Sequence, residues 1–233
     1  MTYILAIDTT LGACSAALIK DGNILGHAME VRARGHVERL LPMVAEVCES
    51  SKVDHRSIDY IVVTIGPGTF AGSRIGLSAA KGMALGLNIP IIPITTFEAI
   101  AEHYAQDNIN FSGNIAVAID ARRGEIYLQS FNIERGKIKS LNEPIAVAYD
   151  QVESKLNSAV DIIVGSGAAL LKNTLKKALF EDGYVYPDAQ KFVKLAEVKI
   201  DYAVMCDNVS PLYLRAPDAV PSKKLNFIAA NYD

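Results

Sequence analysis

The sequence predicts an α/β fold of two related lobes, each with a strand meander followed by a helix, a strand and a second helix. The apolar run YILAID near the N-terminus returns as NIAVAID, which ends at Asp120, and in both places a turn and an alternating strand follow. Behind each meander, apolar residues recur at helical spacing before another short apolar run. A pattern that occurs twice in one chain indicates two units of the same fold.

The first lobe begins with three short strands that form a meander. Their residues are apolar and often β-branched, and Asp21 and Gly22 supply a tight turn between the second and the third strand. A helix follows, in which Val37 and Leu40 begin a series of apolar residues at helical spacing. The elements predicted for this lobe are strands over residues 3–7, 14–20 and 23–31, a helix over 35–48, a strand over 60–66, a helix over 73–87, a strand within 89–95 and a helix near 97–104.

The second lobe repeats this order. Its meander runs to Ser140 and is followed by a helix near 149–156, a buried run over 161–167 and a helix over 168–180. The stretch QDNINFSG gathers turn-forming residues and marks the boundary between the lobes, where a cleft is expected to hold a ligand. The predicted domains are a first lobe over residues 1–106, a second lobe over 113–216 and a loosely packed tail over 217–233.

Composition narrows the class of protein. Half of the 233 residues are hydrophobic and the formal net charge is -3, so the chain can bury a sizeable core and has no basic excess with which to bind nucleic acid alone. No apolar run approaches the ~18 residues of a membrane span, and Asp8 interrupts the first apolar stretch. The three cysteines lie far apart, as is common in a reducing compartment. We therefore expect a cytoplasmic protein without a membrane segment.

A glycine-rich loop, TIGPGTFAGSRIG at residues 64–76, joins a predicted strand to a predicted helix, which is a common place for a phosphate. A Walker-type loop needs a lysine directly after its last glycine, but Ser73 and Arg74 follow Gly72. The glycine spacing also differs from the dinucleotide fingerprint. The sequence therefore predicts a tight joint between strand and helix, in which Arg74 is the remaining candidate for an anion contact.

Small residues form two rows on the helix after this loop. Glycine inside a helix costs roughly 0.5 to 1 kcal/mol relative to alanine, so a packing reason is expected. Such rows let a second helix come close, and that helix belongs either to residues 35–48 of the same chain or to another subunit. The first row is Gly72, Gly76, Ala80 and Ala84, and the second is Ser78, Gly82 and Gly86.

The repeated architecture resembles the actin-like, or ribonuclease H-like, fold of sugar kinases and heat-shock ATPases. In that superfamily the first strand ends in an Asp and a turn that contacts Mg²⁺ and nucleotide phosphate. Asp8, Thr9 and Thr10 are similar to this feature and are candidates, with Arg74, for vestigial nucleotide or phosphate contacts. A carboxylate that only caps the turn explains the same residues equally well.

The sequence pattern indicates no catalytic residue and no metal site. The four histidines have no metal-ligand spacing among themselves, and no Cys-x-x-Cys pair compensates. His36, at the start of a predicted helix, is expected to be solvated. For Asp120, Arg122 and Arg123 we favour a solvated turn with local charge pairing, and contact with an anion in the cleft is the alternative.

Five blocks of sequence together resemble the TsaB family, also called YeaZ, of bacterial tRNA threonylcarbamoyladenosine biosynthesis proteins. They lie between Ile4 and Arg215 in the family's order, and each alone would be a weak signal. The blocks are IDTT with CSAAL, RGHVERLLPM, GPGTFAGSRIGLSAAKGMALGL, DARRGEIY and PLYLR.

The resemblance implies a non-catalytic subunit that binds and activates TsaD. TsaD is the enzyme that transfers a threonylcarbamoyl group to N6 of adenosine 37 in tRNAs reading codons that begin with A. TsaE, a P-loop ATPase, completes the set, and tRNA is reached only through the complex. TsaD carries two metal-binding histidines, and Thr96 and Ile100 stand at the corresponding places here, where neither replaces an imidazole. No intrinsic cofactor is implied; ATP or ADP at the junction with a partner and a homodimer both stay open.

The family also implies that TsaD joins the two helices of the first lobe. The alternative function is a small ATP-dependent kinase or ATPase of the actin-like superfamily. It is disfavoured because the second lobe is short and its glycine-rich adenosine motif is reduced to VGSGAALL. The expected interface positions are Leu40, Leu41, Val44, Gly76 and Ala80.

Overall fold

A five-stranded mixed sheet forms the centre of the first lobe. The computed structural model of the chain describes residues 1–156, 160–175 and 178–215. The strands of this sheet are β1 (Tyr3–Asp8), β2 (Ala13–Lys20), β3 (Asn23–Val31), β4 (Tyr60–Thr64) and β5 (Ile91–Ile94), and the helices of the lobe are α1 (His36–Ser50), η1 (His55–Ser57), α2 (Phe70–Leu87) and α3 (Thr96–Asp107).

The second lobe has a six-stranded sheet and shorter helices. Its strands are β6 (Gly113–Arg122), β7 (Glu125–Glu134), β8 (Lys137–Ser140), β9 (Ile145–Ala148), β10 (Ile162–Val164) and β11 (Leu179–Phe180), and its helices are η2 (Tyr149–Gln151), α4 (Val152–Lys155) and α5 (Ala168–Leu171).

The two sheets share one topology. The strand order is β3-β2-β1-β4-β5 in the first lobe and β8-β7-β6-β10-β11 in the second, with β9 paired to β7. In the first sheet β1 pairs antiparallel with β2 and parallel with β4, and in the second sheet β6 pairs antiparallel with β7 and parallel with β10. The predicted duplication is therefore confirmed, and this order with one reversed strand is that of the ribonuclease H-like, actin-like fold.

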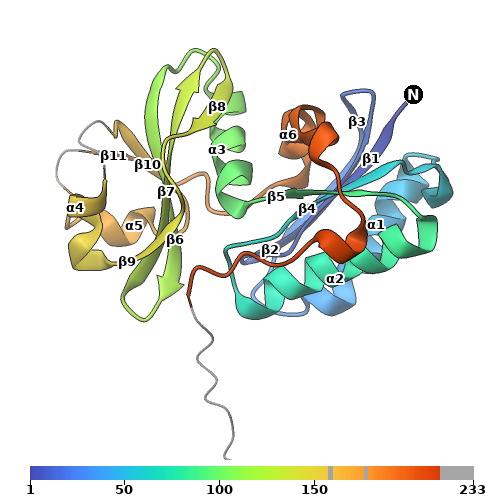
Figure 1. Cartoon of the computed structure of the whole chain (residues 1–233), viewed down its shortest axis with the longest axis horizontal. Helices are drawn as coiled ribbons and strands as arrows, with labels where there is room; N and C mark the ends of the chain where they lie inside the picture. Colours follow the sequence, from blue (N-terminus) through green and yellow to red (C-terminus); the bar gives the residue numbers. More distant parts are fainter. Residues whose placement is uncertain (157–159, 176–177, 216–233) are drawn as a thin grey trace, which may run out of the picture.

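The helices α1 and α2 cover one face of the first sheet, and α3 lies between the two sheets (Figure 1). Leu40 of α1 and Leu77 of α2 belong to one core cluster with Leu5 of β1. On α3, Phe97 packs in a cluster with strands of the second sheet, whereas Ala99 packs with strands of the first. Burial of α3 on both sides joins the lobes through an apolar core.

The chain returns to the first lobe after β11. This return segment, residues 181–215, contains η3 (Ala189–Phe192), α6 (Val193–Lys199), η4 (Ile200–Tyr202) and η5 (Cys206–Asn208). The backbone N–H of Ala189 donates to Ser15 Oγ at 2.8 Å, and Val204 and Ile91 exchange two backbone hydrogen bonds of 2.8 Å. Most of this segment therefore packs on the first lobe, although the sequence analysis assigned it to the second. The predicted tail over 217–233 lies outside the described residues.

The helix predicted over 168–180 is wrong beyond its first turn. Among the described residues of this range, only Ala168–Leu171 is α-helical, and Leu179–Phe180 is a short edge strand that pairs in parallel with β10. A pairing of two residues across a long sequence separation leaves no local periodic signal, so helical spacing alone misassigned the segment.

A helix that could span a membrane is absent from the described part of the chain.

Two glycines of the α2 region provide a test of the packing. A side chain at Gly72 would collide with the backbone carbonyl of Thr9, whereas a side chain at Gly82 would meet nothing within 4 Å. We expect Gly72→Ala to lower the free energy of unfolding by about 1 to 3 kcal/mol. Gly82→Ala is expected to raise it by about 0.5 to 1 kcal/mol. Urea denaturation measures both variants, and equal effects at the two positions would contradict this packing.

Candidate functional site

Asp8 ends β1 and is completely buried. Its Oδ1 accepts hydrogen bonds from the hydroxyl groups of Thr10 at 2.6 Å and Thr64 at 2.5 Å, and from the backbone N–H of Thr10 at 3.2 Å. Its Oδ2 has no hydrogen-bond partner among the described residues. Burial raises the pKa of the Asp8 carboxyl from 3.8 to about 6, and the hydrogen bonds from Thr10 and Thr64 oppose this only in part.

The glycine loop closes the turn that follows β1. The backbone N–H of Thr69 donates to the carbonyl of Thr10 at 2.8 Å, and the Thr9 hydroxyl donates to the carbonyl of Gly72 at 2.7 Å. Asp8, Thr9 and Thr10 are at most 1% exposed. A nucleotide cannot reach them in this arrangement, so we correct their assignment as phosphate contacts. The bond from Thr10 N–H to the carboxylate matches the turn-cap interpretation.

Arg74, the fourth candidate for a phosphate contact, is exposed near the start of α2. Its guanidinium carbon lies 3.5 Å from the centroid of the Phe70 ring, and its Nε donates to the hydroxyl of Tyr213 at 2.7 Å. The two rings themselves are stacked, with centroids 6.1 Å apart. Contacts between α2 and the return segment therefore hold Arg74 at the surface, away from the buried Asp8.

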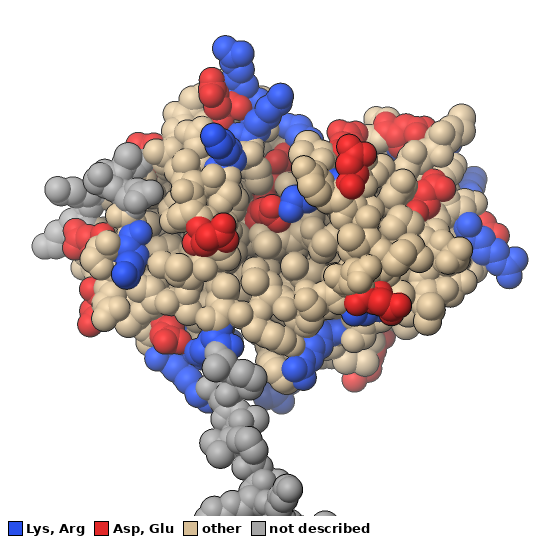
Figure 2. All heavy atoms as spheres, viewed as in Figure 1, with Lys and Arg blue, Asp and Glu red and all other residues tan. Residues whose placement is uncertain are grey.

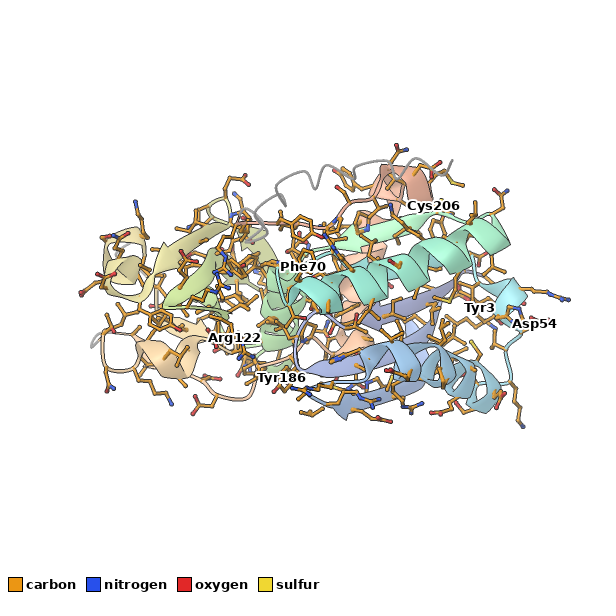
Figure 3. The ribbon with its side chains drawn as sticks, turned by 90° about the horizontal axis from the view of Figure 1, so that it is seen from below. Tyr3, Asp54, Phe70, Arg122, Tyr186 and Cys206 are labelled. Carbon is orange, nitrogen blue, oxygen red and sulfur yellow. The ribbon has the colours of Figure 1, made fainter. Side chains whose placement is uncertain are left out.

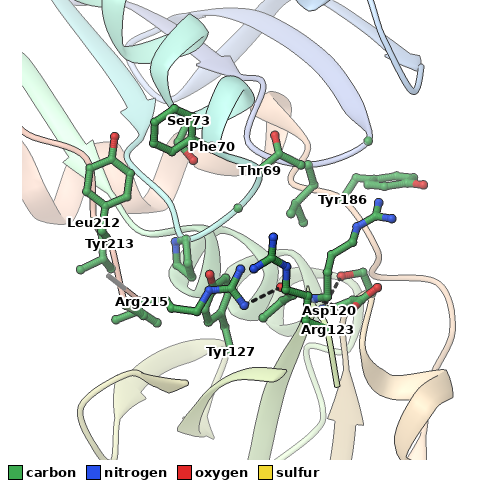
Figure 4. A pocket seen from close by; sticks show the side chains of 18 of the residues that line it. Thr69, Phe70, Ser73, Asp120, Arg123, Tyr127, Tyr186, Leu212, Tyr213 and Arg215 are labelled. Atoms are coloured by element: carbon green, nitrogen blue, oxygen red, sulfur yellow. Dashed lines mark hydrogen bonds between the residues drawn. The ribbon is translucent and has the colours of Figure 1, made fainter. Parts of the chain in front are cut away.

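A pocket of about 820 Å³ lies between the two lobes. Figure 3 places Phe70, Arg122 and Tyr186 in this region, and the close view in Figure 4 shows side chains of both lobes facing one space. Ser73 of α2 also lines it, beside the start of that helix. The aromatic and basic side chains in the lining are Phe70, Tyr127, Tyr186, Tyr213, Arg122, Arg123 and Arg215.

The turn between β6 and β7 brings two arginines to this pocket. Arg122 and Arg123 have φ angles of 63° and 57°, a left-handed conformation that side chains other than Gly, Asn and Asp rarely adopt. The Asp120 carboxylate stabilises the turn, because its Oδ1 accepts from the Arg122 N–H at 2.8 Å and from the Tyr149 hydroxyl at 3.3 Å. Asp120 therefore holds this turn beside the cleft, and contact of its arginines with an anion stays a prediction.

The predicted partner positions lie mostly inside the lobe. Leu40 and Ala80 are at most 1% exposed, and Val44 is 7% exposed. Gly76 is buried against Thr9, so the first row of small residues on α2 faces the sheet rather than another subunit. We correct the hypothesis at Leu40, Gly76 and Ala80, whereas Val44 lines a surface hollow and stays a prediction. Among those proposed, only Leu41 is well exposed, at 53%.

The exposed face of α2 carries the second row of small residues. Ser78 is exposed, and side chains added at Gly82 or Gly86 would meet no atom within 4 Å. Leu85 on the same face is 73% exposed. The sequence analysis identified this row but chose interface positions from the other, because α2 is apolar on most sides and its periodicity does not tell which row meets the sheet.

This exposed face continues onto α1. Val37 and Leu41, one helical turn apart on α1, are both exposed. A surface hollow between the helices is lined by Leu41, Val44 and Met83. We call the exposed side chains of the two helices the helix face; they are Val37, Leu41, Ser78, Gly82, Leu85 and Gly86.

The described residues offer no cluster of three or more His, Cys, Asp or Glu side chains that could hold a metal. At the places where a metal-binding relative would have histidines, Thr96 donates its hydroxyl to Thr10 Oγ1 at 3.3 Å, and Ile100 is fully buried.

The expectation that His36 is solvated is wrong. It is 9% exposed, and its Nε2 lies 3.1 Å from the carbonyl oxygen of Leu11, so the ring ties α1 to the turn after β1.

These features define the class as a two-lobed actin-like protein in which the turn after β1 is closed by the chain's own glycine loop. Residues 24–209 match the family described as TsaD, tRNA N6-adenosine threonylcarbamoyltransferase. The chain is 31% identical to a TsaB of Haemophilus influenzae, over 95% of this chain and 96% of that protein. It is 31% identical to the TsaB of Escherichia coli K12, over 91% and 94%.

A solved structure of YeaZ from Pseudomonas aeruginosa is similar to the chain with a TM-score of 0.83. The two are 27% identical, and the match covers 92% of this chain and 100% of that one. The identity to curated relatives and the matching fold agree over nearly the whole chain. The chain belongs to the TsaB family, also called YeaZ.

The buried Asp8 predicts a specific pH dependence of stability. The folded chain keeps a proton on Asp8 up to pH about 6, whereas the unfolded chain releases it near 3.8, so the folded state binds more protons between these values. The free energy of unfolding therefore falls as the pH rises through this window, by up to about 3 kcal/mol. Asp8→Asn removes the titrating group and should remove this part of the slope. Denaturation of both proteins from pH 4 to 8 measures it, and parallel pH curves would refute the assignment.

Proposed function

We propose that the chain is a non-catalytic subunit of the system that forms threonylcarbamoyladenosine in tRNA, and that it binds and activates a TsaD-type transferase through its helix face. The name of the curated relatives, tRNA threonylcarbamoyladenosine biosynthesis protein TsaB, supports the pathway. The modified position is N6 of adenosine 37 in tRNAs reading codons that begin with A.

The open row of glycines on α2 is the observation that carries the partner site. Gly82 and Gly86 lie within an 18-residue helix, where each costs roughly 0.5 to 1 kcal/mol relative to alanine. No group of the described chain approaches either position, so packing within the chain does not account for them. A helix of another subunit could approach α2 closely there, and the exposed Leu41 and Leu85 would add apolar area to the contact.

A related chain is the natural partner for such a face. The match of residues 24–209 to the TsaD family indicates that this chain and the transferase share a fold, so the corresponding helices of both can pack in one mixed bundle. The same face would serve a homodimer when the partner is absent. TsaE, and ATP or ADP at the junction with a partner, remain predictions from the family.

A small ATP-dependent kinase is the alternative function. The closed turn after β1 argues against it, because Asp8 and Thr10 have no surface to offer a metal-bound phosphate. The role of a non-catalytic subunit therefore explains more features of the structure than the kinase does.

The proposal predicts opposite effects of one substitution on stability and on function. Gly82→Glu places a good helix former at an open position, so we expect the variant to be at least as stable as the parent. A charged side chain in the middle of an apolar contact should weaken binding to the TsaD-type partner by at least about tenfold. In a strain depleted of the native chain, it should fail to restore threonylcarbamoyladenosine in bulk tRNA, measured by mass spectrometry.

Gly183→Glu is the matched control, because Gly183 also has no atom within 4 Å of an added side chain but lies in the return segment beyond β11. It should bind the partner and restore the modified nucleoside like the parent. If depletion leaves the nucleoside unchanged, the proposed pathway is wrong. If Gly82→Glu binds the partner normally, the assignment of the helix face is wrong.

A further inference from the structure

The interlobe pocket has a chemistry that the proposed subunit role leaves unused. Although the chain has a net charge of -3, three arginines line this space against one carboxylate, that of Asp120. The Oδ1 atom of that carboxylate accepts hydrogen bonds from the Arg122 N–H and the Tyr149 hydroxyl. The pocket is therefore a locally basic site, and its occupant should be anionic.

The basic side chains come from separate parts of the chain. Arg122 and Arg123 stand on the β6–β7 turn, Arg215 ends the described return segment, and Arg74 on α2 adjoins the pocket through Phe70 and Tyr213. Arg215 also pairs with Glu125 at 2.8 Å. Figure 2 shows Lys and Arg side chains along the lower edge of the molecule, where the two lobes meet.

Aromatic rings stand beside these charges on both sides of the pocket. Phe70 and Tyr213 form a stacked pair, in which Phe70 is 57% exposed and Tyr213 is 46% exposed. Tyr127 of β7 and Tyr186 of the return segment also line the space, and both are half-buried. Rings next to arginines form the usual surface on which unpaired bases stack while phosphates are neutralised.

We propose that the interlobe pocket binds unpaired nucleotides of an RNA strand, with Arg122 and Arg123 on the phosphates and the rings against the bases. The inference goes beyond the proposed function, which gives the chain a partner site but no contact of its own with RNA. The pocket, of about 820 Å³, is large enough for one or two nucleotides.

The arrangement favours a strand over a free nucleotide. A free nucleotide concentrates its charge at one end and usually needs converging backbone N–H groups, but the glycine loop already uses its Thr69 N–H on Thr10. Here the positive charges are spread over α2, the β6–β7 turn and the return segment. Successive phosphates and bases of a strand match such a spread, since each arginine and ring can meet a different nucleotide.

The test is fluorescence anisotropy of the full chain with a labelled single-stranded RNA of about eight nucleotides, at about 50 mM salt and then at rising salt. The variant is Arg122→Asn with Arg123→Asn, because Asn tolerates the positive φ angles of the turn while it removes both charges. We expect about tenfold weaker binding and a dependence of log K on log salt that is flatter by about 1.4, the value for two lost phosphate contacts.

The matched control is Arg135→Asn. Arg135 also has a positive φ angle, of 53°, but it follows the opposite end of β7 and does not line the pocket. It should bind RNA like the parent. Tyr186→Leu keeps apolar bulk beside Gly12 and should weaken binding about tenfold through lost stacking.

Four results would overturn the inference. The first is that the RNA does not bind at low salt, and the second is that Arg135→Asn loses as much affinity as the double variant. The third is that a duplex of the same length binds as tightly as the single strand. The fourth is that AMP displaces the labelled RNA as well as unlabelled RNA does at the same nucleotide concentration. The last of these would assign the pocket to a free nucleotide. Since the assay contains no partner protein, its outcome is independent of the helix face.

Discussion

The packing of the glycine loop on the turn after β1 is the contact on which the first lobe depends. The backbone carbonyls of Thr9 and Thr10 lie where side chains would be at Gly72 and Gly68, so the two segments meet with only hydrogen between them. This contact buries Asp8 without a charge partner, which raises the pKa of its carboxyl to about 6. It also sets where α2 begins, because Thr69 both bonds to Thr10 and caps the helix.

The same contact separates the carboxylate of Asp8, the pocket between the lobes and the outer face of α2. The carboxylate of Asp8 is sealed inside the lobe, and the pocket between the lobes lies on the other side of the loop, at Gly68 and Thr69. Because α2 is fixed at its first turn with one row of small residues on the sheet, its second row, with Gly82, must face outward. Closure of the turn after β1 and exposure of the helix face are two results of one packing arrangement.

The repeated elements could be predicted well from the sequence, whereas the long-range contacts could not. The two Asp-ended strands, their meanders and the helices α1 and α2 follow from local periodicity, so their prediction was confirmed within a few residues. The edge strand at Leu179–Phe180, the return of residues such as Ala189 to the first lobe, and the burial of His36 depend on distant partners that periodicity does not contain. For the candidate site, the sequence showed both rows of small residues on α2. Only the packing at Gly76 decides which row is exposed.

Hydrogen–deuterium exchange of the full chain, alone and with the TsaD-type partner, tests the central claim most directly. That claim is that α2 uses one face to close the lobe and the other to meet a partner. The account predicts slower exchange in peptides from α1 and α2 when the partner is added, with the β6–β7 turn unchanged. Slower exchange confined to the second lobe, with α1 and α2 unaffected, would contradict it.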